Sequence, residues 1–88
     1  MGLQKSATEI MREHGYSWIS SFAFNRACAQ KDGKQFHIKP DGTRAYRNLY
    51  DWVGLFDKEG RAHARLGDEW FMIGTDGQKL KAPKINKS

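Results

Sequence analysis

The pattern of apolar and polar residues changes once along the chain, near residue 15. Before that point, apolar residues recur at helical spacing: Leu3, Ala7, Ile10 and Met11. Gly15 follows, in the position where a helix commonly ends. After it, alternating apolar positions are separated by turn sequences such as Asp32-Gly33, a strong hairpin signal. The sequence predicts a helix near residues 3–14 followed by an antiparallel β-meander of five to seven short strands, a mainly β fold.

The β-rich part contains an internal repeat. A shift of 35 residues superposes Arg26, Ala27, Ala29, Phe36, Ile38, Asp41 and Gly42 on Arg61, Ala62, Ala64, Phe71, Ile73, Asp76 and Gly77. A shift of 34 superposes Tyr16, Trp18, Ile19 and Phe22 on Tyr50, Trp52, Val53 and Phe56. The difference of one residue falls between Phe22 and Arg26, where a loop or bulge would absorb it. We therefore predict one two-repeat β domain over residues 16–83, after an N-terminal helical segment at 1–15.

The two units of this domain are expected at residues 16–49 and 50–83, each containing one central hairpin. Two-residue turns at Asp32-Gly33 and Gly67-Asp68 fix the register. Small residues then face large ones across each hairpin, which predicts a core of Ala27, Ala29, Phe36, Ile38, Ala62, Ala64, Phe71 and Ile73. The other face of the first hairpin carries Arg26, Cys28, Gln30, Gln35, His37 and Lys39, and we expect it to be polar and in contact with water.

Size and composition limit the kind of protein. The chain has 88 residues, of which 39% are hydrophobic and 28% charged, enough for one small and marginally stable domain. The single cysteine, Cys28, excludes an internal disulfide, so we expect a cytoplasmic location. No apolar run approaches the ~20 residues of a membrane span.

The net charge of +5 resides mainly at the C-terminus. The last ten residues contain Lys79, Lys81, Lys84 and Lys87, and removing these four from the 15 Lys and Arg residues leaves 11 bases against 10 acids. The body of the protein is therefore nearly neutral and lacks the broad basic face of a typical nucleic-acid-binding domain. Residues 84–88 are predicted to form a basic, disordered tail.

The second unit resembles a known bacterial repeat. Residues 56–77 read F-x-x-x-G-R-A-x-A-x-x-G-D-E-W-F-x-I-x-x-D-G, which is similar to the WG (KWG-type) repeat, and residues 50–53 resemble its Y-D-x-V lead-in. The resemblance covers about residues 16–80. Gln35 stands where the repeat has tryptophan, Asn25 where Glu-Gly is usual, and Phe71 replaces the glycine of the W-G pair, so the chain resembles a divergent subtype. Choline-binding repeats are also similar around residues 67–77, but their period is shorter.

The WG resemblance implies a β-rich repeat with no catalytic residues attached to it. Two units are fewer than the three or so that repeat stacking usually needs, so something must cover the ends. The residues themselves show no nucleophile motif, and the aspartates fall in turns, where an aspartate hydrogen-bonds its own backbone. We therefore expect a protein that is not an enzyme and needs no cofactor.

One soft metal-ligand set follows from the predicted register. Cys28 faces His37, and His63 faces Met72 at the equivalent place, a combination suited to Cu(I) or Zn. The four side chains could share a metal only if the two hairpins approached each other on this face. No paired Cys or His motif supports such a site, so we expect that no metal is bound.

The function predicted from these features is a non-enzymatic interaction or scaffold module that presents a sheet surface to a protein or peptide. The expected contact residues are Tyr16, Trp18, Tyr50 and Trp52, and unpaired strand edges favour a homodimer. The alternative is a small basic nucleic-acid-binding protein that uses Lys31, Lys34, Lys39, Arg44, Tyr46 and Arg47.

Overall fold

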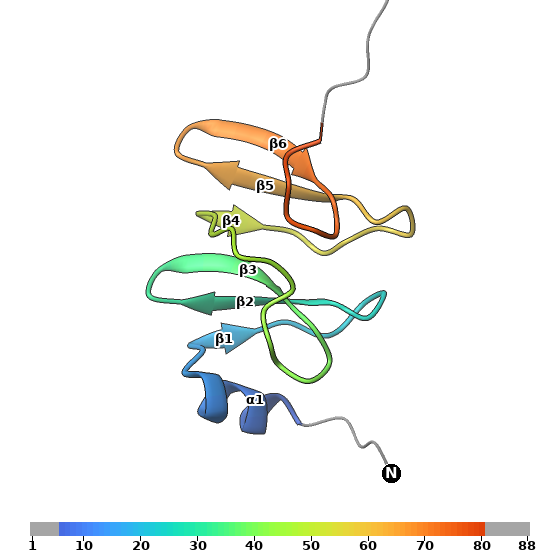
Figure 1. The fold of residues 1–88 in the computed structure, drawn as a ribbon. Helices are drawn as coiled ribbons and strands as arrows, with labels where there is room; N and C mark the ends of the chain where they lie inside the picture. The colour runs from blue at the N-terminus through green and yellow to red at the C-terminus, as the bar shows by residue number, and fades with distance from the viewer. Residues whose placement is uncertain (1–5, 81–88) are drawn as a thin grey trace, which may run out of the picture.

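The computed structural model describes residues 6–80 as one short helix followed by six strands in two antiparallel three-stranded sheets (Figure 1). The first part comprises α1 (Ala7–His14), β1 (Trp18–Ile19), β2 (Ala27–Lys31) and β3 (Lys34–Ile38). The second comprises β4 (Trp52–Val53), β5 (Ala62–Leu66) and β6 (Glu69–Ile73). The helix and the two sheets follow one another along the molecule, which confirms the predicted helix and β-meander.

Helix α1 begins later than the sequence predicts because a capping box fixes its start. The Ser6 hydroxyl accepts the Glu9 N–H at 3.1 Å, and the Glu9 carboxylate accepts the Ser6 N–H at 3.2 Å. At the other end Gly15 adopts φ 74° and donates its N–H to the Met11 carbonyl at 2.8 Å. Both ends of the helix are therefore specified by local residues, a side-chain cap at Ser6 and a glycine in the left-handed conformation at residue 15.

The apolar stripe of this helix is narrower than predicted. Ile10 is fully buried and Met11 packs against the core, whereas Ala7 is exposed. Leu3 lies outside the described residues. A helix of eight residues with one buried side chain closes only one end of the stack.

The predicted hairpin register is confirmed in both units. Ala27 pairs with Ile38 and Ala29 with Phe36, and the residues 35 positions later pair in the same way. The turn at Asp32 and Gly33 has φ angles of 54° and 80°. Positive φ at both turn residues gives the twist that a two-residue hairpin needs. Of the eight predicted core residues, seven are buried and Phe71 is half-buried against the core.

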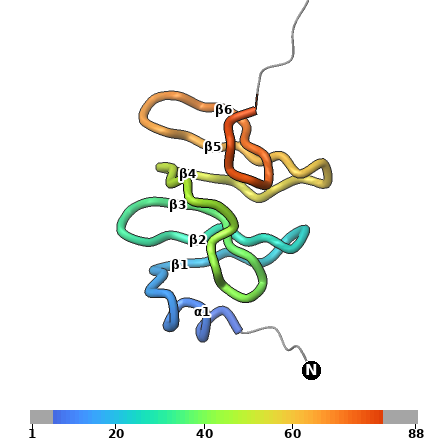
Figure 2. Tube along the Cα trace, viewed as in Figure 1, coloured from blue at the N-terminus to red at the C-terminus, as the bar shows by residue number. Residues whose placement is uncertain are grey.

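The backbone of the second unit repeats the path of the first (Figure 2). The units differ in the loop that leads into their central hairpins. Ala23 and Arg26 pair across a two-residue turn, whereas Asp57 and Arg61 enclose three residues that end in Gly60, with φ 78°. This is the predicted position of the one-residue difference between the two repeat periods.

In each unit, a tyrosine at the start of the unit hydrogen-bonds the Asp-Gly turn near its end. The Tyr16 hydroxyl donates to the Gly42 carbonyl at 2.7 Å, and the Tyr50 hydroxyl donates to the Gly77 carbonyl. These glycines also pack closely on the preceding part of the stack. A Cβ added to Gly42 would lie 2.9 Å from Ile10 Cγ2, and one added to Gly77 would lie 2.3 Å from the Tyr46 ring. The turns are thus stacking contacts as well as chain reversals.

The prediction that the second face of the first hairpin contacts water is wrong at its centre. His37 is 0% exposed and Cys28 is 3% exposed. Alternation along one hairpin assigns this face to solvent, but the second unit lies over it. Val53 contacts Cys28, and Gly54 and Phe56 contact His37. Stacking of the units therefore buries the centre of this face as well as the predicted core face, while Trp18 at its edge stays exposed.

The described residues contain no helix long and apolar enough to cross a lipid bilayer. The predicted end of the β domain at Pro83 and the predicted tail at 84–88 lie outside the described part of the chain.

We predict that Gly77→Ala destabilises the fold by about 3 kcal/mol, because an L-residue at positive φ costs about 1 kcal/mol and overpacking against Tyr46 adds about 2. Gly67→Ala is the matched control, since Gly67 has φ 64° and no atom within 4 Å of an added Cβ. Urea unfolding of both variants should give a loss of only about 1 kcal/mol for the control. Equal losses would contradict the stacking contact.

Candidate functional site

The junction between the two units is built around the His37 side chain. Its Nε2 lies 2.7 Å from the Gly54 carbonyl oxygen, and its Nδ1 lies 2.5 Å from the Tyr46 hydroxyl. A carbonyl only accepts, so Nε2 carries the proton and Nδ1 accepts from Tyr46. The imidazole is also stacked on Phe56, with ring centroids 4.1 Å apart. One neutral tautomer of His37 therefore satisfies polar groups from both units.

Burial sets the protonation of this junction. Desolvation lowers the pKa of His37 to about 4, against the opposing effect of the Gly54 carbonyl, so the ring is neutral at pH 7. Desolvation likewise raises the pKa of the Tyr46 hydroxyl, which remains protonated as a donor. It also raises the pKa of Cys28 to about 11, so this residue is a thiol at neutral pH.

The first unit also binds the backbone that covers it. The Gln35 side chain accepts the Val53 N–H at 3.0 Å, and the backbones of Gln35 and Tyr50 exchange two hydrogen bonds at 2.8 and 3.0 Å. Cys28 Sγ lies 3.7 Å from the Val53 carbonyl. The junction is thus a structural interface with hydrogen-bond partners on both sides.

The soft metal-ligand set is divided between two places. Cys28 and His37 are enclosed at the junction, where His37 already uses both ring nitrogens. His63 and Met72 pair with each other on the corresponding face of the second unit, and His63 is exposed. Within residues 6–80 no group of three or more His, Cys, Asp and Glu side chains is placed to hold a metal ion.

The second unit presents an exposed face that corresponds to the buried face of the first. Cross-strand pairing aligns Trp52 with Arg65 and Arg65 with Trp70, and the pair of His63 and Met72 lies two residues further along the same face. We call these five residues the terminal face. Trp52 is 39% and Trp70 59% exposed, with ring centroids 5.5 Å apart, and the Arg65 guanidinium lies 5.9 Å from the Trp70 centroid.

The four predicted partner-binding residues separate into two pairs. Trp18 and Trp52 are exposed, whereas Tyr16 and Tyr50 are 7% and 4% exposed. The two tyrosines are therefore parts of the core that bind turn carbonyls, which leaves little of either side chain for a partner to contact. They sit at the start of each unit, where the chain enters the stack.

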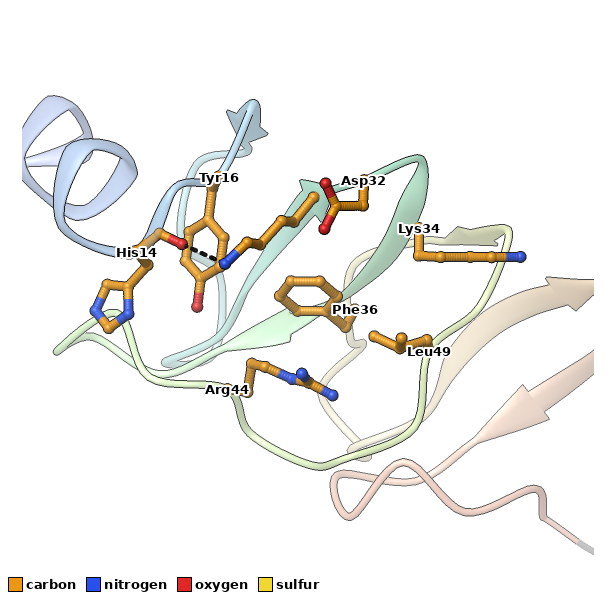
Figure 3. A pocket seen from close by; sticks show the side chains of 8 residues that line it. His14, Tyr16, Asp32, Lys34, Phe36, Arg44 and Leu49 are labelled. Atoms are coloured by element: carbon orange, nitrogen blue, oxygen red, sulfur yellow. Dashed lines mark hydrogen bonds between the residues drawn. The ribbon is translucent and has the colours of Figure 1, made fainter.

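A second candidate site lies on the side of the first unit, between α1, the β2–β3 hairpin and the loop that follows β3 (Figure 3). It is an open hollow of about 310 Å³ lined by His14, Tyr16, Lys31, Asp32, Lys34, Phe36, Arg44 and Leu49. We call it the cationic hollow because three of its lining residues are Lys or Arg and one is acidic. Arg44 lies over the ring of Phe36, with 5.0 Å from the guanidinium carbon to the ring centroid.

The predicted nucleic-acid residues are only partly brought together. Lys31, Lys34 and Arg44 line the cationic hollow, while Lys39 and Arg47 are exposed outside its lining. Tyr46 is 8% exposed and bound to His37, so its ring has no free face for a base. The six residues therefore form no continuous strip of stacking and phosphate-binding groups.

Arg65 and Trp70 belong to the terminal face but are absent from the predicted contact residues. The signal was present in the repeat alignment, because Trp70 corresponds to Gln35 and Arg65 to Gln30. Gln30 and Gln35 pair across the first hairpin, at the junction between the units. Their replacement by Arg65 and Trp70 in the second hairpin marks a surface that no further unit covers among the described residues.

Comparison with models of known protein families, with curated proteins and with solved structures found no match. The WG-repeat resemblance therefore stays a prediction from the sequence.

We predict that the protein loses stability as the pH falls from about 6.5 to 4, by up to about 3 kcal/mol. The folded-state pKa of His37 is depressed to about 4, so the unfolded chain binds a proton in this window and the folded state does not. Hydrogen bonds hold the folded-state pKa values of Asp51 and Asp57 below the usual value, so the stability that these two carboxylates contribute is lost mainly below about pH 4.

Urea unfolding at intervals of pH measures this slope. His37→Gln should be less stable at pH 7 but nearly flat between pH 6.5 and 4, whereas His63→Gln, at an exposed position, should keep the slope. A wild-type slope that survives in His37→Gln would assign the effect to other groups.

Proposed function

We propose that the protein is a non-enzymatic interaction module whose terminal face docks a protein or peptide partner. The observation that carries the proposal is the contrast between two equivalent faces. In the first unit the next segment buries Cys28 and His37 and leaves Trp18 exposed at the edge of the face, whereas in the second unit Trp52 and Trp70 are both exposed beside an arginine. Exposed clusters of large apolar side chains in small proteins are typical of binding surfaces.

The chemistry of the terminal face suits a partner unlike another copy of the repeat. Gln35 and His37 hydrogen-bond the backbone of the segment that covers the first unit. At the same places the second unit has Trp70, which has no oxygen to accept a backbone N–H as Gln35 does, and Met72, which has no N–H to donate to a carbonyl as His37 does. The terminal face instead offers aromatic area and one cation.

These residue types fit the energetics of a docking surface. Tryptophan and arginine are the residues most enriched among those that dominate binding energy at protein interfaces. The Trp52–Trp70 pair is already in ring contact, so little side-chain freedom is lost when a partner binds. A partner with apolar side chains flanked by acidic groups would complement this surface.

Nucleic-acid binding remains the alternative function. Its support is the gathering of Lys31, Lys34 and Arg44 at one hollow, and against it stands the burial of Tyr46. A cytoplasmic location is proposed with either function, because the buried thiol of Cys28 has no cysteine partner in the chain.

We predict that peptides selected on the immobilised protein from a phage-displayed library bind through the terminal face. Trp52→Ala and Trp70→Ala should each weaken their affinity about 30-fold, the effect of losing roughly 2 kcal/mol. Phe24→Ala is the matched control, since Phe24 is 64% exposed but lies in a loop away from this face. Isothermal titration measures all three variants.

The same titration at 50 and 200 mM salt separates the two functions. An apolar interface hardly responds, whereas phosphate-dominated binding of a double-stranded oligonucleotide weakens steeply. Submicromolar oligonucleotide binding that persists after deletion of residues 79–88, together with peptides indifferent to both tryptophan variants, would overturn the proposal.

The homodimer predicted from the sequence would instead pair two terminal faces about a two-fold axis. We expect sedimentation equilibrium at micromolar concentration to show a dimer that Trp70→Ala dissociates. A strict monomer would show that the partner is a different molecule.

A further inference from the structure

The two units carry the same arrangement beside their hairpin turns, with one exchange of charge. In the second unit the Lys79 ammonium lies 4.9 Å from the centroid of the Phe71 ring and 2.7 Å from the Glu69 carboxylate. A cation over an aromatic ring is thus neutralised by a carboxylate on the neighbouring strand.

The first unit repeats the cation and the ring but lacks the carboxylate. Arg44 occupies the place of Lys79, paired with Ile38 as Lys79 is with Ile73, and it lies over Phe36. The place of Glu69 is taken by Lys34, because both residues begin the second strand of the central hairpin.

The cross-strand partner changes in the same direction. Lys34 pairs with Lys31, whereas Glu69 pairs with Leu66. The pair of one carboxylate and one apolar residue in the second unit is therefore replaced by two lysines in the first unit. The cationic hollow therefore carries two lysines at the positions where the second unit has the carboxylate that neutralises Lys79 and an apolar neighbour.

The charges of the cationic hollow are only partly compensated by the protein. Lys34 is paired with Asp51 at 2.6 Å, and Lys31 donates to the backbone carbonyl of His14 at 2.9 Å (Figure 3). The Arg44 guanidinium donates to the Arg47 carbonyl and, among residues 6–80, forms no ion pair with a carboxylate. Arg44 has five donors, so most of them are available.

We propose that the cationic hollow binds the carboxylate of an acidic side chain from a peptide segment of a partner protein. The carboxylate would lie beside the Arg44 guanidinium, as the Glu69 carboxylate lies beside the Lys79 ammonium, and accept hydrogen bonds from Arg44 and Lys31. Leu49, 44% exposed at the same hollow, contacts an apolar neighbour of the acidic residue. This site lies on the first unit, and its argument does not depend on the terminal face.

An acidic peptide fits the hollow better than a nucleic acid does. The volume of about 310 Å³ suits one or two side chains. Tracking of a phosphate backbone requires cations along a path, but Lys39 and Arg47 lie outside the lining and Asp32 is part of it. The aromatic rings of the hollow are also occupied: Phe36 is buried under Arg44, and Tyr16 is stacked on His14.

The test uses the blocked peptide Ala-Glu-Leu-Glu-Ala and its counterpart with glutamine in place of both glutamates. Binding to the full chain is followed at low ionic strength by two-dimensional ¹H–¹⁵N NMR. The glutamate peptide should shift the amides of Lys31, Gly33 and Arg44, and the glutamine peptide should leave them unchanged.

Arg44→Gln and Arg47→Gln form a matched pair, because both remove one charge from neighbouring exposed arginines and only Arg44 lines the hollow. Arg44→Gln should weaken binding about tenfold, as expected for the loss of a charge-assisted hydrogen bond. Arg47→Gln should change it less than about twofold, since Arg47 is exposed outside the lining and an exposed charge without a direct contact contributes little. Arg44→Lys, which copies Lys79, should retain most of the affinity.

Equal weakening by the two glutamine variants would show that net charge alone attracts the peptide and would overturn the proposal. Equal binding of both peptides, or binding of an oligonucleotide in preference to the glutamate peptide, would do the same. Trp70→Ala should leave this binding unchanged, so failure at the cationic hollow is distinguishable from failure at the terminal face.

Discussion

The His37 imidazole is buried where two repeats meet, and it must find both of its hydrogen-bond partners within the protein. Tyr46 supplies a donor from the first unit and Gly54 supplies an acceptor from the second. A buried polar atom without a partner costs roughly 1–3 kcal/mol, so loss of either contact disfavours the stack. The position of the second unit over the first, and with it the burial of Cys28, depends on this side chain together with the hydrogen bonds of Gln35 to Tyr50 and Val53.

The same junction explains why the two ends of the molecule differ. Internal surfaces use short polar side chains, such as Gln35, to bind the backbone of the covering segment. The N-terminal end is closed by α1, whose Ile10 packs on the Gly42 turn. The terminal face has no such polar groups at the matched positions and exposes Trp52 and Trp70 instead. Differences between the two copies of the repeat therefore point to candidate binding surfaces that the features shared by the copies do not reveal.

Much of the fold could be predicted from the sequence because local rules determine it. The Asp32-Gly33 turn sets the register, and the repeat period locates the loop of unequal length before Arg26. The burial of His37 could not be predicted by the same rules, because alternation in one hairpin says nothing about a second layer. The roles of Tyr16 and Tyr50 depend on turns 26 and 27 residues away, and tertiary contacts at that distance leave little local pattern. The cationic hollow is formed by segments far apart in the chain and could not be predicted from local pattern. Its excess of positive charge is visible in the aligned units only as the contrast between Lys34 and Glu69.

The most direct test of the stacked arrangement is long-range ¹H–¹⁵N NMR of the His37 ring between pH 7 and 5. The structure predicts a single neutral tautomer with the proton on Nε2 throughout this range, and nuclear Overhauser effects from the ring to Phe56 and Gly54. Titration near pH 6.5 with rapid exchange between tautomers, and no contact with the second unit, would show that the two repeats do not stack through His37.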